Sequence, residues 1–171
     1  MRRPILLYPD PQLKQVCAPV EDLSDGLRTL ADEMLQTMYA APGVGLAAPQ
    51  VGVLRRLIVM DCATEGAPQP VIMFNPQIEA ASDTHSVHEE GCLSLPEQFA
   101  DITRPAEVRV RWIDRNGVWQ VGDFSGLWAT CVQHEIDHLD GRLFIDYLSL
   151  ARRHMMTRKA LKIKRARMQQ G

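Results

Sequence analysis

The spacing of hydrophobic residues changes along this chain, and helical spacing predicts three helices. In residues 25–40 apolar side chains recur every three or four positions, the period of an amphipathic helix. Ser24 stands directly before this segment as a plausible N-cap. We expect a second helix over 127–140, with Gly141 as its C-cap, and a final helix over 149–168.

Strand patterns fill the region between the helices. Residues 55–60 and 71–74 are short apolar runs of the kind found in buried strands, whereas 107–114 alternates apolar and charged residues and predicts a half-exposed strand. Asn116-Gly117 is a strong hairpin signal and leads to a partner strand near 118–122. A helix, several mainly antiparallel strands around a central helix, and a C-terminal helix together predict an α+β fold.

Composition limits the class of protein. A chain of 171 residues with 46% apolar content is long enough for one globular domain with its own core. No apolar run approaches the roughly 20 residues of a membrane span, and the amino terminus does not have the pattern of a signal peptide. The four cysteines have no disulfide-framework spacing. We therefore expect a cytoplasmic protein with neither a membrane nor DNA as a partner.

The charge is distributed unevenly. The net charge is −2, but residues 151–171 contain eight basic residues and no acidic ones. The other 11 basic residues oppose 21 acidic ones, so residues 1–150 carry about −10. We interpret 1–150 as the catalytic part and 151–171 as a basic helical tail of the same domain. Such a basic block often contacts a polyanion.

The strongest chemical signal is His134-Glu135-Ile136-Asp137-His138, an HExxH sequence. Four residues on a helix return a side chain to nearly the same direction, so both imidazoles can reach one metal ion. Glu135 then lies beside the first ring, where it can handle the proton of a water held at the metal. Two imidazoles leave the site incomplete.

The third ligand of known peptidase patterns is missing downstream. Phe144 occupies the position of the third histidine in HExxHxxGxxH, and no glutamate follows Glu135. Upstream, the segment 90–96 (EGCLSLP) places Cys92 in what we predict to be a short loop between a glycine and a proline. A thiolate is a strong ligand for Fe(II) or Zn(II). The other cysteines are better explained as small buried hydrophobic residues.

Three motifs occur in one order: GVGLAAPQ at 43–50, EGCLSLP at 90–96 and QHEIDH at 133–138. This set resembles the peptide deformylase family, and the likeness runs from Ile5 into the last helix. The resemblance implies a hydrolase that removes the formyl group from the N-terminal formylmethionine of nascent peptides. It implies one divalent metal ion, with Fe(II) favoured and zinc, nickel or cobalt also accepted. It also places such an enzyme at the ribosome, to which the basic tail would bind through ribosomal protein or RNA.

The resemblance assigns roles to individual residues. Cys92, His134 and His138 would bind the metal. Glu135 would transfer the proton, and the Gln50 amide and the Leu93 backbone N–H would stabilise the oxyanion. The residues implied to contact the substrate are Val44, Gly45, Glu90, Gly91, Leu127 and Cys131.

Two positions depart from the common deformylase pattern, and two other functions remain open. Phe99 replaces an arginine near the substrate entrance, and His88 replaces an apolar residue beside the methionine pocket.

The alternative functions are an HExxH zinc endopeptidase and a non-catalytic ribosome-associated homologue. The absence of a downstream ligand argues against the first. The presence of Cys92, Glu135 and Gln50 together argues against the second.

Overall fold

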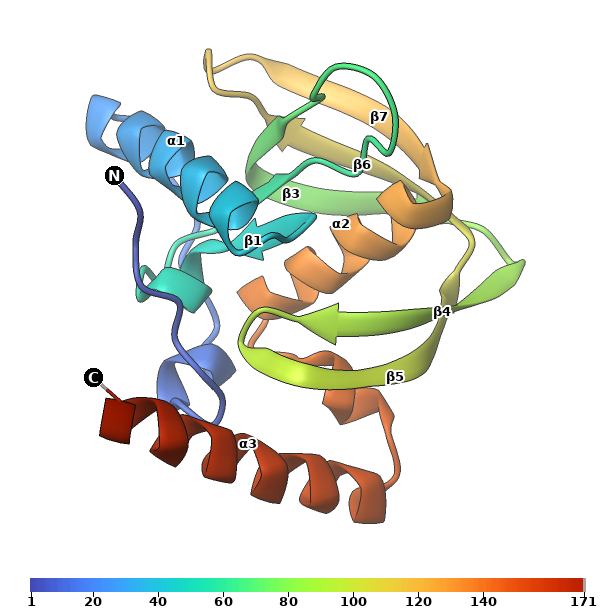
Figure 1. The fold of residues 1–171 in the computed structure, drawn as a ribbon. Coiled ribbons are helices and arrows are strands. Elements are labelled where there is room, and N and C mark those ends of the chain that lie inside the picture. The colour runs from blue at the N-terminus through green and yellow to red at the C-terminus, as the bar shows by residue number, and fades with distance from the viewer. Residues whose placement is uncertain (171) are drawn as a thin grey trace.

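The computed structural model describes residues 1–170 and confirms the predicted α+β fold (Figure 1). Three α-helices and seven strands follow one another with short 3-10 helices between them. Their bounds are η1 (Pro11–Lys14), α1 (Asp25–Ala40), β1 (Gly45–Ala47), η2 (Ala48–Val51), β2 (Leu57–Met60), β3 (Val71–Ala81), β4 (His85–Cys92), β5 (Leu95–Pro105), β6 (Glu107–Ile113), β7 (Trp119–Ser125), α2 (Gly126–Leu139), η3 (Phe144–Tyr147) and α3 (Leu150–Gln170).

The strands form two antiparallel sheets with α2 between them. One sheet has five strands in the order β1-β2-β3-β6-β7, and the other is the β4–β5 ribbon. Figure 1 shows α2 in the centre of the molecule, with the five-stranded sheet above it and the ribbon below. A helix enclosed in this way must bury most of its surface, and ten of its 14 residues are buried. Most of its side chains are therefore packed between the two sheets.

Helix α1 begins and ends as its sequence predicts. The Ser24 hydroxyl accepts a hydrogen bond from the Leu27 N–H at 3.2 Å and so satisfies one of the free amides of the first turn. The apolar face buries Leu30, Met34 and Met38 in a core cluster shared with β1 and β2. Each of these side chains contributes roughly 1.5–3 kcal/mol by leaving water. This packing anchors β1, which forms one edge of the site.

The end of α2 differs by one residue from the prediction. Asp140 is the C-cap, and Gly141 follows it with φ of 74°. The Arg142 N–H donates to the Asp137 carbonyl at 2.9 Å and the Gly141 N–H donates to the His138 carbonyl at 3.1 Å. This is a Schellman motif, in which a glycine takes the left-handed conformation directly after the cap.

The prediction of a loop around Cys92 was wrong. Cys92 is the last residue of β4, and residues 93–94 form the tight connection to β5. The sequence pattern also missed β1 and the extension of β3 to Ala81. The ribbon escaped notice because its outer positions are polar or exposed, so β4 lacks the run of apolar residues typical of a buried strand.

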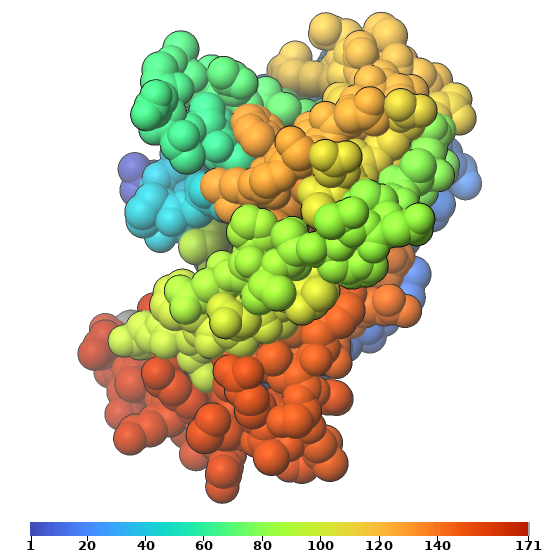
Figure 2. Space-filling view, turned by 90° about the vertical axis from the view of Figure 1, so that its right-hand side faces the viewer, coloured from blue at the N-terminus to red at the C-terminus, as the bar shows by residue number. Residues whose placement is uncertain are grey.

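Helix α3 belongs to the core over its first half. Its buried residues, Met156 and Ala160, pack with Leu95 of β5 and Phe144 of η3. Figures 1 and 2 show the helix lying along the ribbon, at the opposite side of β4–β5 from α2. None of the helices in the described chain is long and apolar enough to span a membrane.

Candidate active site

Three potential metal ligands converge between β4 and α2. Cys92 comes from the end of β4, and His134 and His138 come from successive turns of α2. Their ligand atoms all lie within 4.8 Å of one another, and Cys92 Sγ is 3.4 Å from Nε2 of His138. The two rings meet edge to face with centroids 5.0 Å apart. The helical spacing of HExxH thus brings both imidazoles to one thiol.

Glu90 holds one of these imidazoles in place. Oε1 of Glu90 accepts a hydrogen bond from Nδ1 of His134 at 2.9 Å, which directs the Nε2 lone pair toward the other ligands. The carboxylate also receives Nε and Nη2 of Arg104 at 2.7 and 3.0 Å. The family resemblance implied that Glu90 contacts the substrate. Its side chain borders the cavity, but its oxygens are engaged by His134 and Arg104.

The pKa values of His134 and His138 are shifted in opposite directions by their surroundings. Burial works to lower the pKa of His134, but hydrogen bonds with Cys92 and Glu90 and the charge of Glu135 outweigh it and raise the pKa well above its usual range. Burial, reinforced by the charge of His134, lowers the pKa of His138. A metal ion needs both imidazole lone pairs, so binding at this centre would release a proton from His134.

These residues fit a divalent metal ion. One sulfur and two nitrogens leave a position open for water or substrate, as in catalytic zinc sites. Within residues 1–170, His138 Nδ1 and Glu135 Oε1 are buried side-chain atoms with no hydrogen-bond partner. An unpaired carboxylate oxygen beside the ligand group suits a group that handles the proton of a water. Phe144, at the position of the absent third histidine, stacks on the His134 ring with centroids 6.1 Å apart.

Glu135 lies on α2 between the two histidines and is buried. Burial raises the pKa of Glu135 to about 7, the charge of Glu90 adds to the rise, and the charge of His134 opposes it. A carboxyl with a pKa near neutrality can both accept and return a proton at physiological pH.

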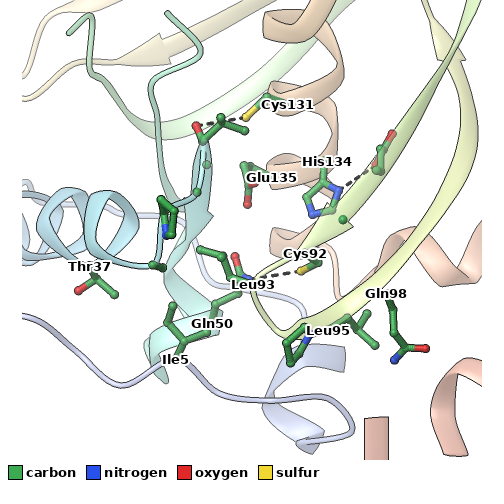
Figure 3. A pocket seen from close by; sticks show the side chains of 18 of the residues that line it. Ile5, Thr37, Gln50, Cys92, Leu93, Leu95, Gln98, Cys131, His134 and Glu135 are labelled. Atoms are coloured by element: carbon green, nitrogen blue, oxygen red, sulfur yellow. Dashed lines mark hydrogen bonds and ion pairs between the residues drawn. The ribbon is translucent and has the colours of Figure 1, made fainter. Parts of the chain in front are cut away.

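Gln50 is held so that its amide nitrogen faces the thiol (Figure 3). Its Oε1 accepts the Ala47 N–H at 3.0 Å, and this fixes which end of the amide points away. Nε2 then lies 3.1 Å from the Ser94 hydroxyl and 3.5 Å from Cys92 Sγ. Leu93 follows Cys92 in the tight connection of the ribbon, and Leu93 and Gln50 both line the cavity beside the ligand group.

Most of these groups line one cavity of about 890 Å³ between β1, α2 and the ribbon. Of the residues proposed from the sequence, all except the fully buried His138 line it. Val44 and Leu127 are its exposed apolar edges, at 44% and 40% exposure. Phe99 also lines the cavity, as its predicted place near the entrance requires, whereas His88 is not among the lining residues.

Two glycines leave room that neighbouring side chains fill. A methyl group on Gly45 would lie 2.5 Å from Oε2 of Glu135 and 2.7 Å from Sγ of Cys131. A methyl group on Gly91 would lie 2.6 Å from the Phe99 ring. At contacts this short the neighbouring side chain must move, so glycine at both positions lets Glu135 and the Phe99 ring lie where they do.

Arg104 is a residue of the site that was not predicted from the sequence. Its signal was present in the alternation of β5, where Ala100, Ile102 and Arg104 occupy every second position and are all buried. A charged residue at an inward position of a strand needs a buried partner. Recognising the strand would therefore have pointed to a carboxylate behind the site.

The fold and site together define a class. An α+β domain in which a thiol and two imidazoles converge beside a buried glutamate and an oriented amide has the composition of a metal-dependent hydrolase.

Comparison with known proteins identifies the family. A sequence model of the family described as polypeptide deformylase matches residues 2–154. A peptide deformylase of Rhizobium meliloti is 49% identical over 166 residues, which is 96% of this chain and 95% of the relative. One from Phenylobacterium zucineum is 52% identical over 161 residues, 94% of this chain and 95% of the relative. The chain belongs to the polypeptide deformylase family.

Solved structures agree with this assignment. The crystal structure of a peptide deformylase from Ehrlichia chaffeensis superposes with a TM-score of 0.94 at 36% identity, covering 98% of this chain and 99% of that one. A second structure from that organism, in complex with actinonin, gives a TM-score of 0.92 at 38% identity and covers 95% and 98%.

Proposed function

We propose that this protein hydrolyses the formamide of N-terminal formylmethionine in newly made polypeptides. The observation that carries the proposal is the convergence of Cys92, His134 and His138, at the edge of a cavity that Glu135 and Gln50 also line. Membership of the deformylase family gives the same activity. The products are formate and a free amino terminus.

Cys92, His134 and His138 would hold one divalent ion. When bound, such an ion polarises a carbonyl oxygen and lowers the pKa of a coordinated water toward neutrality. We propose Fe(II) as the metal in the cell, although the ligand types suit zinc and also accept nickel or cobalt. Metal analysis of protein purified without oxygen tests the identity. Activity of the iron form should decay in air, whereas nickel or cobalt substitution should preserve it.

The residues around the ligands supply the remaining chemistry. The Gln50 amide and the Leu93 N–H would donate to the formyl oxygen as it gains negative charge, and one such donor is typically worth about 3–4 kcal/mol. Glu135 would take a proton from the attacking water and return it to the leaving nitrogen. Its lack of another hydrogen-bond partner among the described residues leaves Oε1 available for that exchange.

The cavity beside these groups would bind the methionine. Val44, Leu127 and Cys131 offer an apolar wall, and Gly45 and Gly91 leave the backbone open to an extended peptide. Phe99 adds an exposed aromatic ring at the rim, 59% exposed, where it can pack on the residues that follow methionine.

A substrate comparison tests the proposed function. We expect rapid turnover of a formyl-Met-Ala peptide and little turnover of the acetyl-Met-Ala peptide, because the acetyl methyl group would crowd the carbonyl carbon. Comparable rates on both would contradict deformylation. A zinc endopeptidase would instead digest casein, and a non-catalytic homologue would turn over neither peptide.

We also propose that the basic residues of α3 dock the enzyme on the ribosome. Six of the eight basic side chains of the tail are exposed, and the chain before them is acidic. Clustered lysines and arginines on one helix bind phosphate backbones by releasing counterions. Such docking would place the cavity near emerging nascent chains.

A further inference from the structure

A buried arginine links the two elements that carry the metal ligands. Nε and Nη2 of Arg104 contact the carboxylate of Glu90 on β4, and Nη1 donates to Oδ2 of Asp137 on α2 at 2.9 Å. The side chains of Arg104 and Glu90 are 6% and 4% exposed, so water cannot replace either partner. A guanidinium has enough donors to satisfy both carboxylates at once.

The link lies directly behind the ligand group. Glu90 is two residues before Cys92 in β4, and Asp137 is adjacent to His138 in α2. Arg104 therefore spans the strand that carries the thiol and the helix that carries the imidazoles. Arg104 also binds the Glu90 carboxylate that accepts the hydrogen bond from His134, and so helps to fix the ring of His134.

Tyr147 of η3 contacts both Asp137 and Arg104 from the protein surface. Its hydroxyl donates to Oδ2 of Asp137 at 2.8 Å, the same oxygen that accepts Nη1 of Arg104. Its ring lies against the guanidinium, with the central carbon 5.0 Å from the ring centroid. Tyr147 is 48% exposed, so it can be changed without opening the core.

We propose that Tyr147 and Asp137 are positioning residues that set how tightly the centre retains its metal, acting through Arg104. The inference rests on the proposed metal shell of Cys92, His134 and His138. The Tyr147 hydroxyl and Arg104 both donate to Oδ2 of Asp137. Asp137 in turn holds the guanidinium group that orients Glu90. Weakening these contacts lets Glu90 and the His134 ring rotate, and the distance between β4 and α2 is then less tightly fixed.

The test measures metal release rather than turnover. Zinc-loaded protein is mixed with excess of a chromophoric chelator, and the release rate is followed for Tyr147→Phe and Asp137→Asn. Residues behind metal ligands typically contribute about 10–100-fold to affinity. We expect release about tenfold faster for Asp137→Asn and severalfold faster for Tyr147→Phe, which keeps the ring on Arg104. The visible absorption of the cobalt form should shift in the same two variants.

Asp146→Asn is the matched control. Asp146 accepts from Lys14 Nζ at 2.7 Å, so this change weakens another polar contact of η3 without touching Asp137 or Arg104. It should release zinc at the wild-type rate even where it lowers the melting temperature as much as Tyr147→Phe does.

Wild-type release rates and cobalt spectra in both variants would overturn the inference. So would equal acceleration in Asp146→Asn, because the effect would then come from loosening η3. If Asp137→Asn fails to fold, Tyr147→Phe decides alone. Failure of the wild-type protein to bind zinc or cobalt would instead contradict the proposed metal shell.

Discussion

Gly45 and Glu135 approach so closely that no side chain fits between them. A methyl group on Gly45 would lie 2.5 Å from Oε2 of Glu135 and 3.0 Å from the carboxyl carbon. Strand β1 thus passes directly against the face of α2 that carries the proposed proton carrier. The position of the carboxylate is set by the absence of a Cβ on the neighbouring strand.

Gly45→Ala should therefore reduce turnover while the metal stays bound. The added methyl must displace Glu135 or move β1 away, and a shift of about 1 Å in a reacting group can cost about 100-fold in rate. The atoms nearest to the new methyl belong to Glu135 and Cys131 and not to the three ligands, so metal content should remain near one per chain. Steady-state kinetics on formyl-Met-Ala and metal analysis together check this.

Gly26→Ala is the control for adding a methyl group. Gly26 lies in α1, and its nearest neighbour would be the Ser24 hydroxyl at 3.7 Å. Alanine there should leave turnover unchanged and should not destabilise the fold, since glycine is less favourable than alanine in a helix. A Gly45→Ala enzyme as active as Gly26→Ala would show that Glu135 tolerates displacement.

Cys92→Ala and Glu135→Gln should separate ligation from proton transfer. Loss of the thiol removes one of three ligands, so Cys92→Ala should lose both metal and activity. Glutamine keeps the shape of Glu135 but cannot accept the proton, so Glu135→Gln should keep the metal and lose about 100-fold or more of kcat. Metal content by atomic absorption decides the first point. Loss of metal from Glu135→Gln would make that residue a ligand or a structural group.

The sequence predicted the parts of the site that depend on local periodicity. The four-residue spacing of His134 and His138 puts them on one face of any helix, and in the structure both lie within reach of Cys92. The roles of Glu90 and Arg104 depend on the pairing of β4 with β5 and on the packing of α2 against that ribbon. These long-range relations leave no local pattern, apart from the inward alternation that ends at Arg104.

Gly141→Ala should destabilise the protein more than the same change at Gly66. Both glycines have positive φ, 74° and 76°, so each substitution incurs the left-handed penalty of about 1–2 kcal/mol. A methyl on Gly66 would meet nothing within 4 Å, whereas one on Gly141 would lie 2.5 Å from the Lys14 carbonyl oxygen. We expect an additional loss of about 1–3 kcal/mol at Gly141 from this overpacking. Urea denaturation of the two variants measures it, and equal losses would argue that η1 moves aside freely.

The ribosome proposal is best tested by substitution, because deleting α3 would remove Met156 and Ala160 from the core. Arg158, Lys162 and Arg165 line one surface hollow of α3 and are exposed. Changing all three to glutamine should weaken co-sedimentation with ribosomes. If each contacts a phosphate, the slope of log affinity against log salt should fall by about 3 in total.

Activity on formyl-Met-Ala should be unchanged in this triple variant, because none of the three residues lines the catalytic cavity. Arg55→Gln, at an exposed arginine on the acidic body, controls for loss of positive charge elsewhere and should bind ribosomes nearly as the wild type does. A triple variant that pellets with ribosomes as the wild type does, with the same salt slope, would show that this face of α3 is not the docking element. A loss of binding with an unchanged slope would mean that the face acts through contacts other than phosphates.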